Sequence, residues 1–280
     1  MDIFFKAHGV TMEQSNRILV TSCKGGVGKS TVSANLAYAL TKLGKTVLLV
    51  DMDLGNRSLD IMLGLEDRTL FDISDVASGT VSADRAVITS EERPRLVFCA
   101  APYMYNGSIT PETLEKALSE LEEYVRPDYT ILDTSGGADC SVMLSAACAK
   151  RAIIVTTPAP AAVRAAEKSG ELLSSAGVED MMLVVSYLAT DPKSAKEHYG
   201  VNDMIDRTAV RIVGIVPRDA ELAILSEKGL LCGESKKYKA ISGKAFENIA
   251  ARLEGGSRPL LYGVRGIKNR RKLLLSGSGL

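Results

Sequence analysis

Two lysines and three glycines lie in one short stretch of the chain, TSCKGGVGKST at residues 21–31. Gly25, Gly26 and Gly28 have no side chains, so their backbone N–H groups can approach an anion closely. In the pattern Gly-Lys-Ser, Lys29 can reach the β- and γ-phosphates of a nucleotide, and the Ser30 hydroxyl can ligate Mg²⁺. The stretch therefore predicts a phosphate-binding loop, but this pattern gives no role to the second lysine, Lys24.

Three carboxylates follow apolar runs elsewhere in the chain and could complete such a site. LLVDMD ends in Asp51 and Asp53, and YTILD ends in Asp133. An aspartate at the end of an apolar strand commonly holds Mg²⁺, often through water. A carboxylate near the γ-phosphate can also orient an attacking water molecule. We expect these side chains to converge on the phosphate loop.

The pattern of elements around these residues predicts an α/β fold with a mostly parallel sheet. Apolar, β-branched runs without polar alternation are typical of strands buried on both faces. Amphipathic stretches between them predict helices on both faces of the sheet, with functional loops at the carboxyl ends of the strands. Strands are expected at 17–22, 46–51, 95–101, 129–135, 152–158, 182–187 and 211–217, and helices at 30–43, 111–124, 138–149, 161–176, 219–228 and 240–254.

Composition excludes several other classes of protein. The chain has 280 residues, with 34 basic and 34 acidic side chains, so no global positive charge points to nucleic acid. Its five cysteines form no C-x-x-C pair, which argues against a disulfide framework and for a reducing cytosol. The N-terminus makes a poor signal peptide, and no apolar run approaches membrane-spanning length. We expect an extension at 1–14, one domain at 15–254 and a basic, leucine-rich tail at 255–280.

The form K-G-G-V-G-K-S resembles the deviant Walker A motif of the MinD/ParA family of ATPases. The resemblance extends over about residues 17–254, follows the family's order of motifs and favours its MinD-like branch. It implies the three-layer fold of P-loop NTPases, binding of ATP and Mg²⁺, and ATP hydrolysis. It also implies an ATP-dependent homodimer, in which Lys24 reaches phosphate oxygens of the nucleotide held by the other subunit.

The same resemblance assigns the remaining roles. Asp53 would orient the attacking water, and Asp51 and Asp133 would lie at the metal with Ser30. Pro217, in GIVPRDAEL, would contact the adenine, and the nucleotide contacts would be completed by Lys24, Val27 and Thr31. Two stretches depart from the family pattern. Thr-Ser-Gly-Gly follows Asp133, and Ser186-Tyr187 stands where many relatives place an asparagine that reads the adenine edge.

The expected function is that of a cytoplasmic switch ATPase that positions a partner or cellular structure, at the division site or in another spatial process. A ParA-like DNA partition protein, a regulator of flagellar number and a non-hydrolysing adaptor remain alternatives. An iron–sulfur carrier is a further one, because Cys140 follows Asp133 by seven residues. The sequence does not name the activating or effector protein.

The tail gives one further expectation, of peripheral attachment to an anionic membrane. Its apolar residues could share a helical face, with basic residues elsewhere. A disordered basic tail explains the same pattern, and DNA binding is a weaker third reading. The apolar set is Leu260, Leu261, Val264, Ile267, Leu274 and Leu275, and the basic set is Arg265, Lys268, Arg270 and Lys272.

Overall fold

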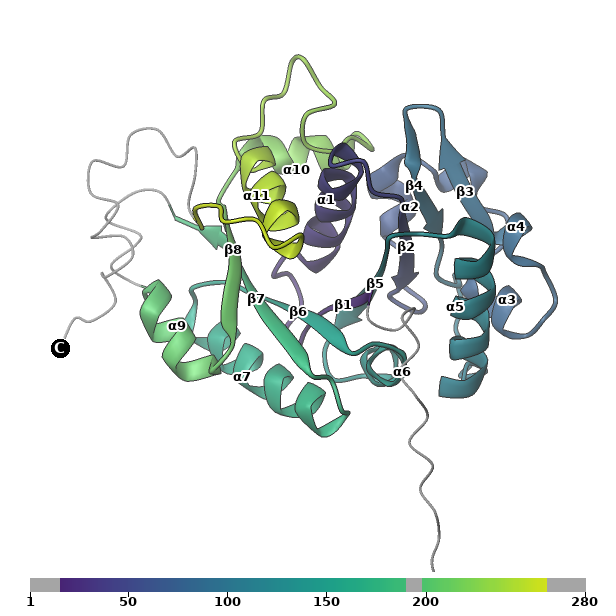
Figure 1. The fold of residues 1–280 in the computed structure, drawn as a ribbon, viewed down its shortest axis with the longest axis horizontal. Helices are drawn as coiled ribbons and strands as arrows, with labels where there is room; N and C mark the ends of the chain where they lie inside the picture. The colour runs from purple at the N-terminus through teal and green to yellow at the C-terminus, as the bar shows by residue number, and fades with distance from the viewer. Residues whose placement is uncertain (1–15, 190–197, 261–280) are drawn as a thin grey trace, which may run out of the picture.

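The computed structural model describes residues 16–189 and 198–260, which form an eight-stranded sheet with helices on both faces (Figure 1). The strand order is β3-β4-β2-β5-β1-β6-β7-β8, and every neighbouring pair is parallel except β3 with β4. The predicted mostly parallel α/β fold is therefore confirmed. The strands are β1 Arg17–Ser22, β2 Val47–Met52, β3 Val87–Ser90, β4 Arg93–Cys99, β5 Tyr129–Gly136, β6 Arg151–Thr156, β7 Asp180–Leu188 and β8 Arg211–Pro217.

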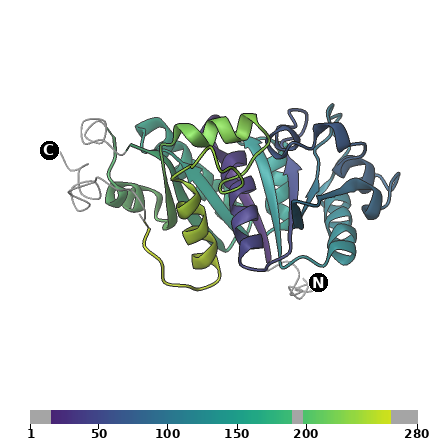
Figure 2. The same cartoon turned by 90° about the horizontal axis from the view of Figure 1, so that it is seen from above.

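The helices divide between the two faces according to the alternation of side chains along the strands. In β1, Ile18 and Val20 face one core while Leu19 faces the other, as the two-residue period of a strand requires. The first face is covered by α1 (Lys29–Lys42), α2 (Leu59–Leu63), α10 (Ala220–Glu227) and α11 (Gly243–Leu253). The second is covered by α3 (Ile73–Ala77), α4 (Ala83–Ala86), α5 (Pro111–Val125), α6 (Cys140–Cys148), α7 (Pro160–Ser175) and α9 (Val201–Thr208). Figures 1 and 2 show α1 and α11 packed side by side on the first face.

All seven predicted strands and six predicted helices are present, with ends that differ by a few residues. The strand β3 was not predicted. It is short, antiparallel to β4 and only partly buried, so it lacks the apolar run that identified the others. The short helices α2, α3 and α4, the helix α9 and the 3₁₀ turn at Glu66–Arg68 also fell outside the predicted ranges. Among the described residues, no helix is long and apolar enough to cross a membrane.

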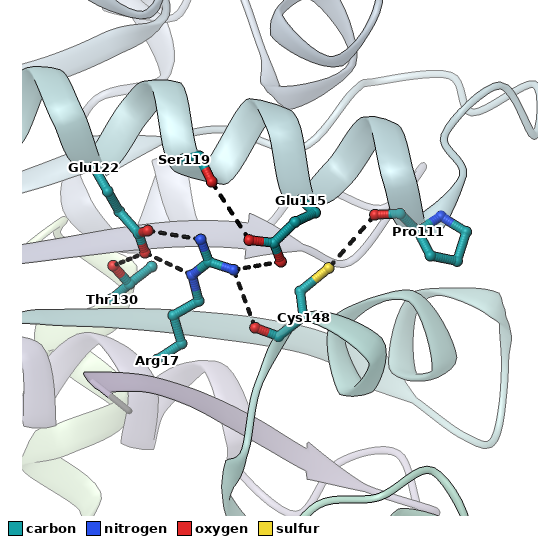
Figure 3. A network of polar contacts seen from close by, with 7 residues as sticks. All are labelled: Arg17, Pro111, Glu115, Ser119, Glu122, Thr130 and Cys148. Carbon is teal, nitrogen blue, oxygen red and sulfur yellow. Dashed lines mark hydrogen bonds and ion pairs between the residues drawn. The ribbon is translucent and has the colours of Figure 1, made fainter. Parts of the chain in front are cut away.

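A buried ionic network fastens the amino-terminal end of β1 to α5 and α6 (Figure 3). The Arg17 side chain is only 1% exposed. Its guanidinium donates from Nε and Nη2 to the two carboxylate oxygens of Glu122, at 2.8 and 2.7 Å. It also donates from Nη1 to Glu115 at 2.6 Å and to the Cys148 carbonyl oxygen at 3.2 Å. Two carboxylates thus neutralise one buried cation, and the pKa of Arg17 is raised above its usual value although burial alone would lower it.

Replacing Arg17 with alanine should therefore lower the free energy of unfolding by about 3–5 kcal/mol, because it leaves the largely buried Glu122 carboxylate without its partner. Arg151 on the neighbouring strand is the matched control. It pairs with the more exposed Asp180 at 3.3 Å, so Arg151→Ala should cost only about 0–1 kcal/mol. Urea denaturation of both variants measures the free energy of unfolding. Equal decreases in the two variants would show that the Arg17 network contributes no more to stability than the exposed Arg151 pair.

Candidate active site

The loop between β1 and α1 has the backbone conformation of a phosphate-binding loop. Gly26 and Gly28 have φ angles of 73° and 90°, in the left-handed region that glycine adopts without a steric penalty. Gly25 and Gly26 are exposed, so no side chain covers this part of the loop. Ser169 of α7 fixes the start of the loop, because its hydroxyl accepts a hydrogen bond from the Cys23 N–H at 2.8 Å.

The amino-terminal end of α1 is left open to an anion. Its N-cap is Gly28, which provides no side-chain oxygen, and its first turn has no acidic residue. The first N–H groups of a helix need partners from outside the helix, and their partial positive charge favours an anion. The loop and the helix end therefore form the kind of site that binds phosphate groups.

Lys29 lies at this point and is 7% exposed. Burial lowers the pKa of its ammonium group, while the carboxylates of Asp133, Asp53 and Asp139 act in the opposite direction. No ion pair within 4.0 Å joins Lys29 to a carboxylate in the described part of the chain. A bound phosphate group would supply the close negative charge that this buried cation favours.

A cavity of about 490 Å³ opens in front of the loop, a size typical of small-molecule sites. Its wall combines the phosphate loop with the segment that follows β2 and with the carboxyl ends of β5 and β7. The residues that line it are Gly25, Gly26, Gly28, Lys29, Ser30, Thr31, Asp53, Asn56, Ser58, Met62, Ser135, Gly136 and Tyr187. Six of the predicted nucleotide contacts and the predicted water-orienting Asp53 therefore border one cavity.

Asp133 is fully buried beside this cavity, and its carboxylate is incompletely satisfied. Its Oδ1 accepts a hydrogen bond from the Ser33 hydroxyl at 2.6 Å, but its Oδ2 has no partner of ordinary geometry among the described residues. Burial raises the pKa of Asp133 to about 6, although the hydroxyls of Ser33 and Ser30 and the Lys29 ammonium lower it. Carboxylate and hydroxyl oxygens are the ligands that Mg²⁺ prefers, so Asp133 and Ser30 fit a magnesium ion that comes with the nucleotide.

Asp51 lies next to Asp133 in the pairing of β2 with β5 and is also fully buried. Burial, followed by repulsion from Asp133, raises its pKa to about 8. Its two oxygens accept hydrogen bonds from the backbone N–H groups of Asp53, at 2.9 Å, and Leu59, at 3.2 Å. In this geometry Asp51 shapes the loop that carries Asp53. The Asp53 carboxylate lines the cavity and accepts a hydrogen bond from the Asn56 amide at 3.1 Å.

The segment after Asp133 approaches the phosphate loop closely. Gly136 pairs with Ser22 of β1, and a Cβ atom at Gly136 would lie 2.7 Å from the Gly25 Cα and 3.1 Å from the Lys29 Nζ. Only glycine fits this approach without a shift of the backbone. This is a physical reason for glycine at position 136 within the Thr-Ser-Gly-Gly stretch.

The other three predicted contacts, Lys24, Val27 and Pro217, do not line this cavity, and Val27 is buried. Pro217 lines a second, smaller cavity of about 50 Å³, which also contains Gly28, Thr31 and Tyr187. Lys24 is half-buried and does not line either cavity, and its backbone N–H donates to the Ser22 hydroxyl at 3.2 Å.

Sequence reasoning missed several residues that support the site. Ser33 lies one helical turn after Lys29, and this spacing could have placed its hydroxyl near Asp133. Asp139 caps α6 by accepting hydrogen bonds from the N–H groups of Ser141 and Val142, and it also bonds to the Ser135 hydroxyl. No local signal could have linked Ser169 to the phosphate loop, since 146 residues separate it from Cys23.

Comparison with known proteins agrees with this geometry. The family model ParA, described as "NUBPL iron-transfer P-loop NTPase", matches residues 13–254. The chain belongs to the ParA family of P-loop NTPases. Within that family it is MinD-like, since it is 38% identical to the septum site-determining protein MinD of Synechocystis sp. over 88% of this chain and 92% of that protein.

Two further relatives agree. The MinD protein of Bacillus subtilis is 34% identical over 87% of this chain and 90% of its own length. The structure of the MinC:MinD cell division protein complex of Aquifex aeolicus matches with a TM-score of 0.80 and 31% identity, over 88% of this chain and 98% of that chain. The resemblance proposed from the K-G-G-V-G-K-S motif and the predicted P-loop NTPase fold are thereby confirmed.

The cysteines do not gather into a cluster site. Cys99, Cys148 and Cys232 are buried, and Cys140 is exposed at the first turn of α6. Burial raises the pKa of the Cys148 and Cys232 thiols to about 12. Within residues 16–189 and 198–260, no group of three or more His, Cys, Asp or Glu side chains is arranged to hold a metal ion.

Replacing Lys29 with alanine should abolish nucleotide binding, because the mutant loses the ammonium that faces the phosphate cavity. Lys116→Ala, on the exposed side of α5, is the matched control and should bind normally. Isothermal titration calorimetry with Mg-ATP measures both variants. Normal affinity in the Lys29 variant would contradict the phosphate-loop assignment.

Proposed function

We propose that this protein binds and hydrolyses Mg-ATP, dimerises in its ATP-bound state and acts as a MinD-like regulator of the division site. The observation that carries the proposal is the open end of α1, with the buried Lys29 ammonium facing the cavity between the phosphate loop and Asp53. The relatives named septum site-determining protein support the cellular role.

Each side chain of the site has a separate task in this proposal. The N–H groups of the phosphate loop and Lys29 bind the β- and γ-phosphates, and Asp53 orients the water that attacks. Ser30 and Asp133 would hold the magnesium ion, with Asp51 close to the ion and also positioning the loop that carries Asp53. The ion, when bound, neutralises charge on the phosphate oxygens.

Asp53→Ala should bind ATP but hydrolyse it about 100-fold more slowly or worse, because the mutant loses the group that positions water. Asp67→Ala, at an exposed position outside the cavity, serves as the control. Single-turnover phosphate release, measured beside ATP binding, separates the two steps. Unchanged turnover in the Asp53 variant would mean that another group orients the water.

Lys24 is proposed to act in the dimer rather than in its own site. It does not line the cavity of its own chain, and its ammonium has no hydrogen bond or ion pair within the described residues. A cation supplied by a second subunit would stabilise the charge that gathers on the phosphates, as an arginine finger does.

Lys24→Ala should therefore bind a slowly hydrolysed ATP analogue with nearly normal affinity yet remain monomeric. Light scattering after size-exclusion chromatography gives the mass of the wild-type protein, the variant and the Lys116→Ala control with the analogue bound. A Lys24 variant that dimerises like the wild type would remove the role in trans.

Two proposals concern the surroundings of this switch. The Aquifex MinD was solved in complex with MinC, which supports an effector protein as the partner here. Attachment of a cytoplasmic protein to the inner face of the membrane is proposed for the tail. Most of that segment, residues 261–280, lies outside the described residues.

Removal of residues 261–280 should abolish co-sedimentation of the ATP-bound protein with anionic liposomes and leave dimerisation intact. Each basic residue near an anionic surface contributes about 1 kcal/mol, so two tails in one dimer bind better than one. The truncation keeps the hydrogen bond from the Asn248 amide to the Pro259 carbonyl oxygen at 3.2 Å, which fastens the end of the described chain to α11. Full-length protein that ignores liposomes but binds duplex DNA with a steep salt dependence would favour a partition function instead.

A further inference from the structure

A lysine-rich loop connects α10 to α11 at the top of Figure 1. Residues 228–244 contain a single acidic residue, Glu234, and its charge is already neutralised. The Glu234 carboxylate accepts hydrogen bonds from Nε and Nη2 of the buried Arg93, both at 2.7 Å. The loop therefore carries an excess of positive charge, which comes from Lys228, Lys236, Lys237, Lys239 and Lys244.

Most of these lysines have no carboxylate partner. Lys244 forms an ion pair with Glu247 at 2.7 Å. The other four are exposed and form no ion pair within residues 16–189 and 198–260, and we call them the lysine patch: Lys228, Lys236, Lys237 and Lys239. Like charges gathered in one loop repel one another, so an anionic surface placed against the patch would be attracted to it.

The ring of Tyr238 lies within the patch and gives it a fixed base. The Nζ atoms of Lys228 and Lys237 lie 5.8 and 5.1 Å from the centre of the ring. Tyr238 is half-buried against the first core, and its backbone N–H donates to the Ser235 hydroxyl at 3.0 Å. The lysines are therefore presented by a packed part of the folded domain.

The patch lies next to the place where the described chain ends. Lys42, at the end of α1, donates from its Nζ to the Cys232 carbonyl oxygen of the lysine-rich loop at 3.1 Å. Lys42 also borders a cavity of about 430 Å³ together with Arg258 and Pro259, shortly before residues 261–280 begin. None of the patch lysines lines the phosphate cavity. The patch and the start of the tail are thus neighbours on the first face, outside the nucleotide site.

The composition of the patch favours an anionic membrane over a nucleic acid. It has no arginine, the residue best suited to bidentate contacts with phosphates and bases. The Tyr238 ring is packed against the core and flanked by ammonium groups, so it offers no open platform for a base. Instead, exposed apolar side chains accompany the lysines, since Ile241 is 46% exposed and Leu43, beside Lys42, is 47% exposed. Lysines mixed with exposed apolar side chains are typical of surfaces that lie at a membrane interface.

We propose that the lysine patch is a second membrane contact, made by the folded domain with anionic lipid headgroups. This inference rests on the proposed attachment through residues 261–280 and extends it to a surface of the folded domain. The patch adds to the affinity of the tail and does not replace it. A single attachment leaves the domain free to rotate, whereas a tail and a neighbouring patch together turn the face of α1 and α11 toward the bilayer.

The test compares two double variants of the full-length protein. Lys236→Gln/Lys239→Gln alters the patch without touching the two ammonium contacts of Tyr238, and Lys116→Gln/Lys168→Gln removes two exposed charges from α5 and α7 on the second face. Co-sedimentation with phosphatidylcholine liposomes that contain increasing fractions of phosphatidylglycerol is measured with Mg²⁺ and a slowly hydrolysed ATP analogue. Light scattering with the same analogue shows whether both variants still fold and dimerise.

The patch variant should bind anionic liposomes about tenfold more weakly or worse, because each cation near such a surface raises the affinity about fivefold. The control variant should stay within about twofold of the wild type, since its two lysines face away from the membrane. The difference between the variants should shrink as the salt concentration rises, because salt screens the attraction.

The outcomes separate the patch from the tail. Equal binding by the two double variants would overturn the patch proposal, and so would a decrease of the same size on liposomes without phosphatidylglycerol. A patch variant that loses affinity for duplex DNA but not for anionic liposomes would overturn it in favour of a nucleic-acid surface. Liposome binding that survives removal of residues 261–280 would instead refute the proposed tail attachment, while the comparison of the double variants would still decide the role of the patch. A wild-type protein that ignores anionic liposomes would refute both membrane proposals and leave ATP binding and dimerisation untouched.

Discussion

The burial of the Lys29 ammonium is the constraint on which the rest of the site depends. Removing a cation from water is unfavourable unless other charges compensate for it. Here Asp133, Asp53 and Asp139 compensate from a distance, without an ion pair at contact. The open end of α1 adds further positive potential at the same place. The Lys29 ammonium and the end of α1 thus direct positive charge at the cavity, where phosphate oxygens would pair with it.

The amino-terminal and carboxyl-terminal ends of the parallel strands differ in how many of their buried polar groups have hydrogen-bond partners. At the amino-terminal edge, the Arg17 guanidinium is enclosed by two carboxylates and a carbonyl oxygen. At the carboxyl-terminal edge, the Asp133 Oδ2 lacks a partner and the first turn of α1 lacks a side-chain cap. Buried groups without partners lower stability, so such groups are expected where a ligand completes them. The buried polar groups are therefore paired at the amino-terminal ends of the strands, whereas some of those at the carboxyl-terminal ends have no partner among the described residues.

Several contacts connect the separate segments of that edge to the phosphate loop. Gly136 lies against Gly25, the Ser186 hydroxyl donates to the Val27 carbonyl oxygen, and the Ser169 hydroxyl accepts a hydrogen bond from the Cys23 N–H. Each contact is short and involves backbone atoms of the phosphate loop. A displacement of one of these segments would therefore displace the loop as well.

The sequence by itself determined the class of fold and the centre of the site. The buried strands were recognisable because uninterrupted apolar, β-branched runs are typical of strands buried on both faces. The phosphate loop was recognisable because a strand, three glycines, Lys29 and the start of a helix follow one another in the order that such a loop requires. The family resemblance also followed from local motifs, and it predicts a role for Lys24 that spacing alone did not. By contrast, β3 escaped notice because a short, half-exposed edge strand contains little apolar signal.

Only the tertiary structure decided how the remaining groups are used, since those uses depend on contacts between distant segments. Asp51, Asp53 and Asp133 all end apolar runs of the sequence, yet of the three only Asp53 lines the cavity, because Asp51 and Asp133 lie within β2 and β5 and are fully buried. The need for glycine at 136 arises from the approach of two strands that are separated in the chain. The direction of Tyr187 depends on a one-residue mismatch between β7 and β8, and that mismatch becomes visible only when the two strands are paired.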